Sequence, residues 1–228
     1  MKETALDSCV NGAASPEVYV AERRRWTVLG VFLYLTCTNN MLWMTFSPIR
    51  AASAHYYGVS GVAIDNLSLV YMYVYPLCAI LFAWYAEPSA DRVVFGLKAS
   101  AVLNFIAAGL RWASTTRETK SFALVFFGQT LAAISQGATL AAPPRLASTW
   151  FLESEWGLAT GLGVFANQLG PVVAFYCAPA LVPRVGVSLA PAISGVEIAF
   201  VDSCASSPFL LSSTFRLFFP RRYGFRHP

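Results

Sequence analysis

Long runs of apolar residues, separated by short polar connectors, dominate the sequence. Five runs reach the length of about 20 residues that a helix needs to cross the hydrocarbon core of a membrane. They cover residues 26–46, 62–86, 93–112, 122–140 and 158–182. Because the connectors are short, consecutive helices should pack as antiparallel neighbours. The pattern predicts an all-α integral membrane protein with five clear spans.

Three segments of different character follow from this pattern. Residues 1–22 are polar and are expected to form a loose cytoplasmic tail. Residues 23–183 contain the five spans and form the helical bundle. Residues 184–228 are atypical, because the apolar stretch at 185–201 is interrupted by Pro191, Gly195 and Glu197, and the one at 209–219 is too short to cross. A sixth span and a misread end of the gene are both open interpretations of this last segment.

The composition agrees with a chain that faces lipid. Hydrophobic residues make up 56% of the sequence and charged residues 12%, with a net charge of +4. A soluble domain carries about 25% charged residues, so this chain has too little charge to cover a surface in water. The basic residues are scattered between apolar runs and form no basic stripe, which argues against binding of nucleic acid. The expected surroundings are a lipid bilayer.

The residues that support catalysis or metal binding are sparse. The five cysteines lie far apart and resemble neither a disulfide framework nor a zinc site. The two histidines are His55, in a short connector, and His227, in the last segment. No zinc-protease pair, nucleophile elbow or phosphate loop is present. We therefore expect no catalytic residues, no metal site, no cofactor and no enzymatic activity.

The distribution of lysine and arginine predicts the orientation, because cytoplasmic loops are enriched in these residues. With the N-terminus inside, the inner segments hold Lys2, Arg23, Arg24, Arg25, Arg92, Lys98 and Arg145. The outer segments then hold Arg50, Arg111, Arg117, Lys120 and Arg184. The three consecutive arginines before the first span decide this balance. We expect a multi-pass protein of the plasma membrane with a cytoplasmic N-terminus.

Polar and small side chains recur at helical spacing inside four of the five spans. Such residues are costly in hydrocarbon and usually face the protein interior or a cavity. The stripes comprise Thr36, Asn40, Trp43 and Ser47; Asp65, Ser68, Met72 and Tyr75; Gln129 and Gln136; and Thr160, Gly163, Asn167 and Gly170, with Gln168 adjacent. Their convergence predicts a hydrated cavity within the bundle. Packing between helices is the alternative role for each single residue.

The chemistry of these side chains favours a particular class of solute. The candidate cavity combines Trp43, Met72 and nearby tyrosines with neutral amides, and it contains no deeply placed lysine or arginine. Aromatic faces attract organic cations such as quaternary ammonium groups. Asp65 is the only candidate for a titratable group in the pathway, so we expect transport without proton coupling. Asn40, Asp65 and Tyr75 are expected to line the cavity.

Several short motifs follow one another along residues 24–183. They are Asn40-Met41-Leu42-Trp43, His55-Tyr56-Tyr57-Gly58-Val59-Ser60, Ile64-Asp65-Asn66-Leu67-Ser68, Tyr71-Met72, Leu103-Asn104, Ser135-Gln136, Pro144-Arg145-Leu146-Ala147-Ser148-Thr149-Trp150-Phe151 and Phe165-Ala166-Asn167-Gln168-Leu169-Gly170. In their order and spacing they resemble the feline leukaemia virus subgroup C receptor family of the major facilitator superfamily.

The resemblance implies transport of choline, ethanolamine or heme by two six-helix halves that rock around a site near the membrane midplane. It implies that Trp43, Met72 and Gln136 match cavity residues of the choline-binding site, with Asn167 and Gln168 in a matched motif nearby. The chain would correspond to the N-terminal half-bundle of such a carrier.

The sequence also departs from the family pattern. Residues 87–92 are a poor copy of the inner-loop motif of the superfamily, so the resemblance supports the fold but not the gating of the family. Residues after Pro183 do not match the sixth helix of the family, and no second half follows them. The alternative to a carrier fragment is therefore a half-transporter that does not transport by itself, or a membrane partner that pairs with a complementary half-bundle.

Overall fold

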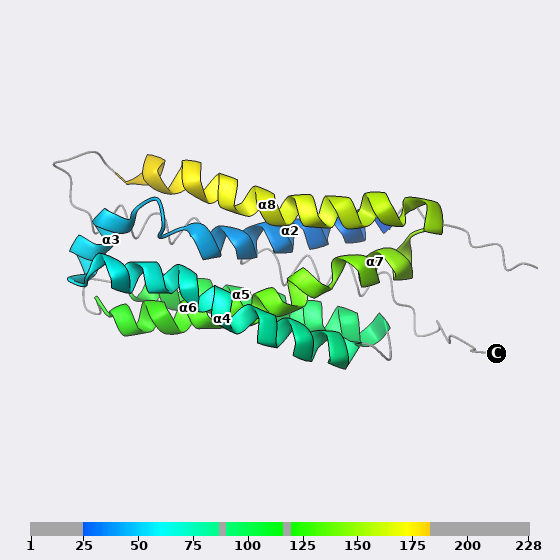
Figure 1. The fold of residues 1–228 in the computed structure, drawn as a ribbon, viewed down its shortest axis with the longest axis horizontal. Helices are drawn as coiled ribbons and strands as arrows, with labels where there is room; N and C mark the ends of the chain where they lie inside the picture. Colours follow the sequence, from blue (N-terminus) through cyan, green and yellow to red (C-terminus); the bar gives the residue numbers. More distant parts are fainter. Residues whose placement is uncertain (1–24, 87–89, 116–119, 183–228) are drawn as a thin grey trace, which may run out of the picture.

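The computed structural model describes residues 25–86, 90–115 and 120–182, and these residues form an elongated helical bundle (Figure 1). Its five long helices are α2 (Arg25–Met44), α4 (Gly61–Ala86), α5 (Ala90–Ala113), α6 (Phe122–Ala141) and α8 (Trp156–Leu181). Each coincides with one predicted span. The expected tail at 1–22 and the atypical segment at 184–228 lie outside the described residues.

Two short helices occupy connectors for which the hydropathy pattern predicts no helix. Helix α3 (Arg50–Tyr57) follows α2, while α7 (Pro143–Trp150) and the 3-10 turn η1 (Glu153–Glu155) precede α8. Gly58 ends α3 with a φ of 65°, and the Val59 amide donates to the Ala54 carbonyl at 3.1 Å. A left-handed residue at this position is a common helix end that favours glycine.

Four of the described helices are long and apolar enough to cross a membrane, against the five that we expected. They are α4, most of α5, α6 and the stretch Glu153–Ala180, which includes α8. Helix α2 is absent from this set although it has 20 residues. Thr36, Thr38, Asn39 and Asn40 lower its hydropathy, and all four side chains are buried in the bundle. Helix α2 thus faces protein more than lipid.

The helices pair in an order that differs from their order along the chain. Helix α2 packs mainly against α8, the last described helix, while α6 packs against both α4 and α5. Figure 1 shows α2 and α8 side by side along the bundle, with α4, α5 and α6 next to them. The prediction that consecutive helices are the main neighbours holds for α5 and α6. It is wrong for α2 with α4 and for α4 with α5, since both pairs share few contacts.

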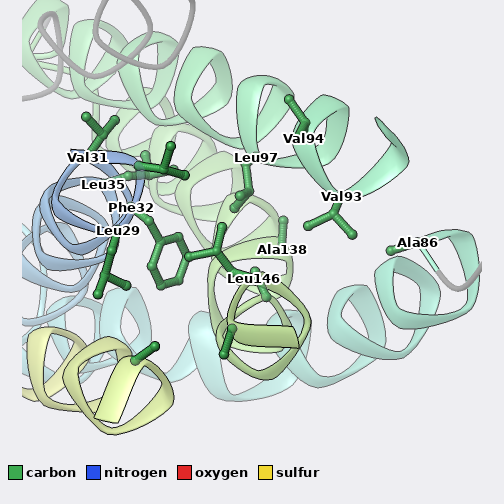
Figure 2. Packing of buried hydrophobic residues seen from close by; sticks show 14 of the residues in the cluster. Leu29, Val31, Phe32, Leu35, Ala86, Val93, Val94, Leu97, Ala138 and Leu146 are labelled. Atoms are coloured by element: carbon green, nitrogen blue, oxygen red, sulfur yellow. The ribbon is translucent and has the colours of Figure 1, made fainter. Parts of the chain in front are cut away.

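Two apolar clusters occupy the two ends of the bundle. The first joins Phe32 and its neighbours on α2 to Leu97 of α5 and Leu146 of α7, and Figure 2 shows Phe32 facing Leu146. The second joins Leu42 and Phe46 to residues of α3, α4, α5, α6 and α8. Between these clusters α2 carries Asn39 and Asn40, both buried. The middle of the bundle is therefore polar, and it contains three of the predicted site residues, Asn40, Gln136 and Asn167.

Candidate functional site

Three of the predicted site residues form a chain of amides across the middle of the bundle. Gln136 of α6 donates from Nε2 to Oδ1 of Asn40 at 3.0 Å. Asn40 of α2 donates from Nδ2 to the Thr36 carbonyl at 2.9 Å and to Oδ1 of Asn167 on α8. The structure thus brings together Asn40, Gln136 and Asn167, which are far apart in the sequence. Asn40 and Gln136 are buried, and Asn167 is half-buried.

Small residues allow α8 to approach α2 at this level. A Cβ atom at Gly170 would lie 2.5 Å from the Cys37 carbonyl oxygen and 2.7 Å from Cβ of Asn40. A Cβ atom at Gly163, two turns earlier, would lie 3.1 Å from Pro143 and 3.3 Å from the Phe32 ring. Gly163, Asn167 and Gly170 were predicted to share one stripe, and this stripe faces α2. Packing explains its two glycines, as interhelical contacts favour small residues.

An aromatic pair lies one turn beyond Asn40. The rings of Trp43 and Tyr71 have their centroids 6.3 Å apart with an interplanar angle of 34°. Trp43 donates from Nε1 to the Ser68 carbonyl at 3.2 Å, and this bond links α2 to α4. Tyr71 is fully buried, whereas Met72 beside it is 41% exposed. Trp43, Tyr71 and Ser68 therefore meet at one place, and Met72 lies at its exposed margin.

The remaining predicted site residues lie apart from the amide chain. Asp65 accepts from Nε and Nη2 of Arg50 at 2.7 and 2.9 Å. This hydrogen bond and the charge of Asp65 raise the pKa of Arg50 above its ordinary value. Tyr75 is half-buried and Gln168 is exposed. Asp65 thus belongs to an ion pair between α3 and α4 at the end of the bundle.

A second polar network joins α2, α5 and α6. Asn39 donates from Nδ2 to Oδ1 of Asn104 at 2.8 Å and to the Ala132 carbonyl at 3.0 Å. Ser100 and Ser135 share a hydrogen bond of 2.8 Å. All four side chains are buried. No polar stripe was predicted on the third span, although Ser100, Asn104 and Arg111 recur there at helical spacing and indicate this face.

Arg111 is buried in the bundle, which corrects its predicted place in an outer segment. It was assigned to the outer loops, but it lies in the last turns of α5 and its side chain is fully buried. Its Nη1 donates to the Leu42 carbonyl at 2.9 Å and to Oε1 of Gln129 at 3.0 Å. Gln129, predicted to lie on the same face of α6 as Gln136, serves this contact instead of the amide chain.

The site as a whole offers neutral hydrogen-bonding groups next to aromatic rings. Oε1 of Gln136 is buried and accepts no hydrogen bond from the described part of the chain. Leaving a buried acceptor without a donor costs about 1–3 kcal/mol, so a bound molecule with a hydroxyl or ammonium donor would gain from reaching it. Within the described ranges, no group of three or more His, Cys, Asp or Glu side chains is arranged to hold a metal ion.

Comparison with known proteins adds a further finding. The chain is 38% identical over 171 residues to an uncharacterized MFS-type transporter of Caenorhabditis elegans, covering 73% of this chain and 27% of that protein. It is 34% identical over 175 residues to the human choline/ethanolamine transporter FLVCR2, covering 77% and 32%. It is also 34% identical over 183 residues to solute carrier family 49 member A3 of Danio rerio, covering 79% and 38%. No family model matches the chain.

The chain spans about a third of the length of these curated relatives. The relatives are transporters, and the alignments cover about three quarters of this chain. The helical bundle with its four apolar spans agrees with a multi-pass membrane protein of this kind. The chain belongs to the family of MFS-type transporters that includes the choline/ethanolamine transporters.

Proposed function

We propose that this chain is part of a carrier for a small organic cation of the choline and ethanolamine type. The observation that carries the proposal is the contact of Trp43 with Tyr71, one turn from the amide chain of Asn40, Gln136 and Asn167. Five of the similar proteins bear the name choline/ethanolamine transporter, which supports this class of substrate. Among the described residues of the site, the neutral side chains suit a single positive charge better than the two carboxylates of heme.

Each chemical group of choline or ethanolamine has a residue in the proposed site that it can contact. A quaternary ammonium group is attracted to aromatic faces by about 0.5–2 kcal/mol, and Trp43 supplies the strongest such face. Met72, exposed beside Tyr71, offers a polarisable contact for methyl groups. The hydroxyl group of choline or ethanolamine can donate to Oε1 of Gln136, which lacks a donor in the described chain. Gln168 and Tyr75 are proposed to line the approach to this site, and Asp65 its outer end.

The transporting unit is proposed to include a complementary half-bundle. Met72 is 41% exposed and Gln168 is exposed as well, so the described helices leave both side chains uncovered. A carrier must enclose its solute from both sides in turn, and this requires a second bundle against these side chains. We further propose that the unit lies in the plasma membrane with its N-terminus in the cytoplasm and acts as a carrier without enzymatic activity.

Uptake of radiolabelled choline tests the proposal. It is measured in cells that express the 228-residue chain. Separately, it is measured in cells that express a continued form, in which the transcript after the codon for Pro183 is translated into a sixth helix and a second half-bundle. The continued form is expected to take up choline, and excess ethanolamine is expected to compete. Trp43→Ala should raise the KM by about 2- to 30-fold, the range that corresponds to the loss of a cation–π contact. Trp43→Phe, which keeps a ring, should have a smaller effect.

Trp84→Ala is the matched control. Trp84 lies on α4 and is 76% exposed, away from the amide chain, so its removal should leave the KM unchanged. Equal effects of Trp43→Ala and Trp84→Ala would remove Trp43 from the site. Competition by heme without competition by ethanolamine would reject the proposed substrate class. Uptake by the printed chain alone would reject the need for a complementary half-bundle.

A further inference from the structure

The C-terminal end of α2 is held by side chains from two other helices. Helix α2 ends at Met44, so the carbonyl groups of its last turn lack partners within the helix. The Leu42 carbonyl accepts from Nη1 of Arg111 at 2.9 Å and from Nε2 of Gln129 at 3.1 Å. The Trp43 carbonyl lies 3.5 Å from the same Nε2 atom. Donors from α5 and α6 thus replace the hydrogen bonds that the helix cannot supply.

The charge of Arg111 suits this position. The C-terminal end of a helix carries a partial negative charge, and a cation placed there is stabilised. The guanidinium group also lies over the ring of Phe46, with Cζ 4.7 Å from the ring centroid. Phe46 and Arg111 are both fully buried. These contacts offset part of the cost of removing an arginine from water.

The packing of α5 against α6 leaves room for this side chain. A Cβ atom at Gly128 would lie 3.0 Å from the Ala107 carbonyl oxygen and 3.1 Å from Cγ of Arg111. Glycine at this position therefore lets the two helices approach while the stem of Arg111 passes between them. Gln129, the next residue of α6, meets the guanidinium group through its Oε1 atom at 3.0 Å.

We propose that Arg111 is a positioning residue, which together with Gln129 caps α2 and thereby fixes the ring of Trp43 against Tyr71. Trp43 is one of the last two residues of α2, and its backbone carbonyl belongs to the capped turn. If this turn frays, the indole ring loses its defined position and its bond to the Ser68 carbonyl. The role of Arg111 in solute binding rests on the proposed function, whereas its effect on Trp43 does not.

The fluorescence of Trp43 tests the proposal without any substrate. Each chain is purified in lipid nanodiscs, and the signal of its Trp43→Phe counterpart is subtracted to isolate Trp43. In Arg111→Gln, quenching of Trp43 by acrylamide should rise about twofold because the uncapped turn opens locally. Arg111→Lys keeps the charge but loses the planar fork, so its effect should be smaller. Arg92→Gln, at the other end of α5, is the control and should leave Trp43 unchanged.

Gln129→Glu keeps the proposal testable if Arg111→Gln fails to fold. The new carboxylate still pairs with Arg111 but removes the amide donor from the Leu42 and Trp43 carbonyls, so quenching of Trp43 should again rise. An unchanged Trp43 signal in a folded Arg111→Gln chain would overturn the proposal. If Arg111→Gln loses its helical circular dichroism and so fails to fold, Gln129→Glu decides the matter. An unchanged Trp43 signal in Gln129→Glu would then overturn the proposal. A choline titration forms a separate arm: no response of Trp43 to choline would count against the proposed substrate and leave the capping result standing.

Discussion

At the scale of single residues, the described bundle uses its buried amides mainly to bind one another. Asn40, Gln136 and Asn167 form one chain, while Asn39 and Asn104 form a second pair with two serines around it. Helical spacing indicated that several of these residues face inward. It could not assign partners, because an amide in a packed contact and an amide in a hydrated cavity show the same spacing.

The hydrogen bond between Asn39 and Asn104 provides a test at this scale. Asn39→Ala, Asn104→Ala and the double variant form a cycle that isolates the energy of the pair. We expect a coupling energy of about 0.6 kcal/mol and at most about 1.7 kcal/mol, as measured for hydrogen bonds between membrane helices. The free energy of unfolding in mixed micelles is the quantity to compare. Strictly additive effects of the two substitutions would contradict the bond seen here.

At the scale of helices, hydropathy predicted the positions of all five long helices, since a span must have a minimum length and few charges. It missed α3 and α7, which are eight residues each and lie in connectors. Tyr56 and Tyr57 hold α3 in place by hydrogen bonds to the Thr115 carbonyl and the Ser114 hydroxyl. Such contacts depend on residues about 57 positions away, and a local pattern contains no information about them.

Hydropathy also could not show that α2 pairs with α8. This pairing depends on the absence of side chains at Gly163 and Gly170, and the two glycines are informative only when the opposite surface is known. Helical spacing placed both glycines on one stripe with Asn167, and the stripe was predicted to line a cavity. The structure turns that face toward α2, where close approach of the backbones is the requirement.

Gly170→Ala is the corresponding prediction for the helix pair. The added methyl group would lie 2.5 Å from the Cys37 carbonyl oxygen, so α8 must move away from α2. We expect a loss of about 1–3 kcal/mol in the free energy of unfolding, the usual cost of overpacking. Gly161→Ala is the control on the same helix, because a Cβ atom there meets nothing within 4 Å. A Gly170→Ala chain as stable as the Gly161→Ala chain would contradict the close packing.

At the scale of the whole molecule, the two ends of the bundle carry ion pairs that differ in their exposure. One end carries the exposed ion pair of Arg50 with Asp65. The other carries Arg25 and Glu155, with Nη1 and Oε2 at 2.8 Å and side chains that are 13% and 26% exposed. Arg25 also lies over the rings of Trp26 and Phe151. The arginine that helped to predict the orientation thus joins the start of α2 to the turn before α8.

Chemical labelling of single cysteines tests the orientation. In a chain whose natural cysteines are replaced by alanine, Ser60→Cys and Ser154→Cys place one thiol at each end, and both positions are exposed. With a cytoplasmic N-terminus, a membrane-impermeant maleimide added to intact cells should label Ser60→Cys alone. Ser154→Cys should react only after the membrane is permeabilised. Labelling of Ser154→Cys in intact cells would reverse the proposed orientation.

The low hydropathy of α2 has a consequence for how the protein is made. This helix leaves the ribosome before the other described helices, yet its amides Asn39 and Asn40 find partners on helices that are synthesised later. Until Asn104 and Ala132 have been added, lipid offers these groups nothing to bind. We expect the nascent first helix to stay beside the translocon and to enter the bilayer together with its later neighbours, so that insertion and folding of this protein are one event.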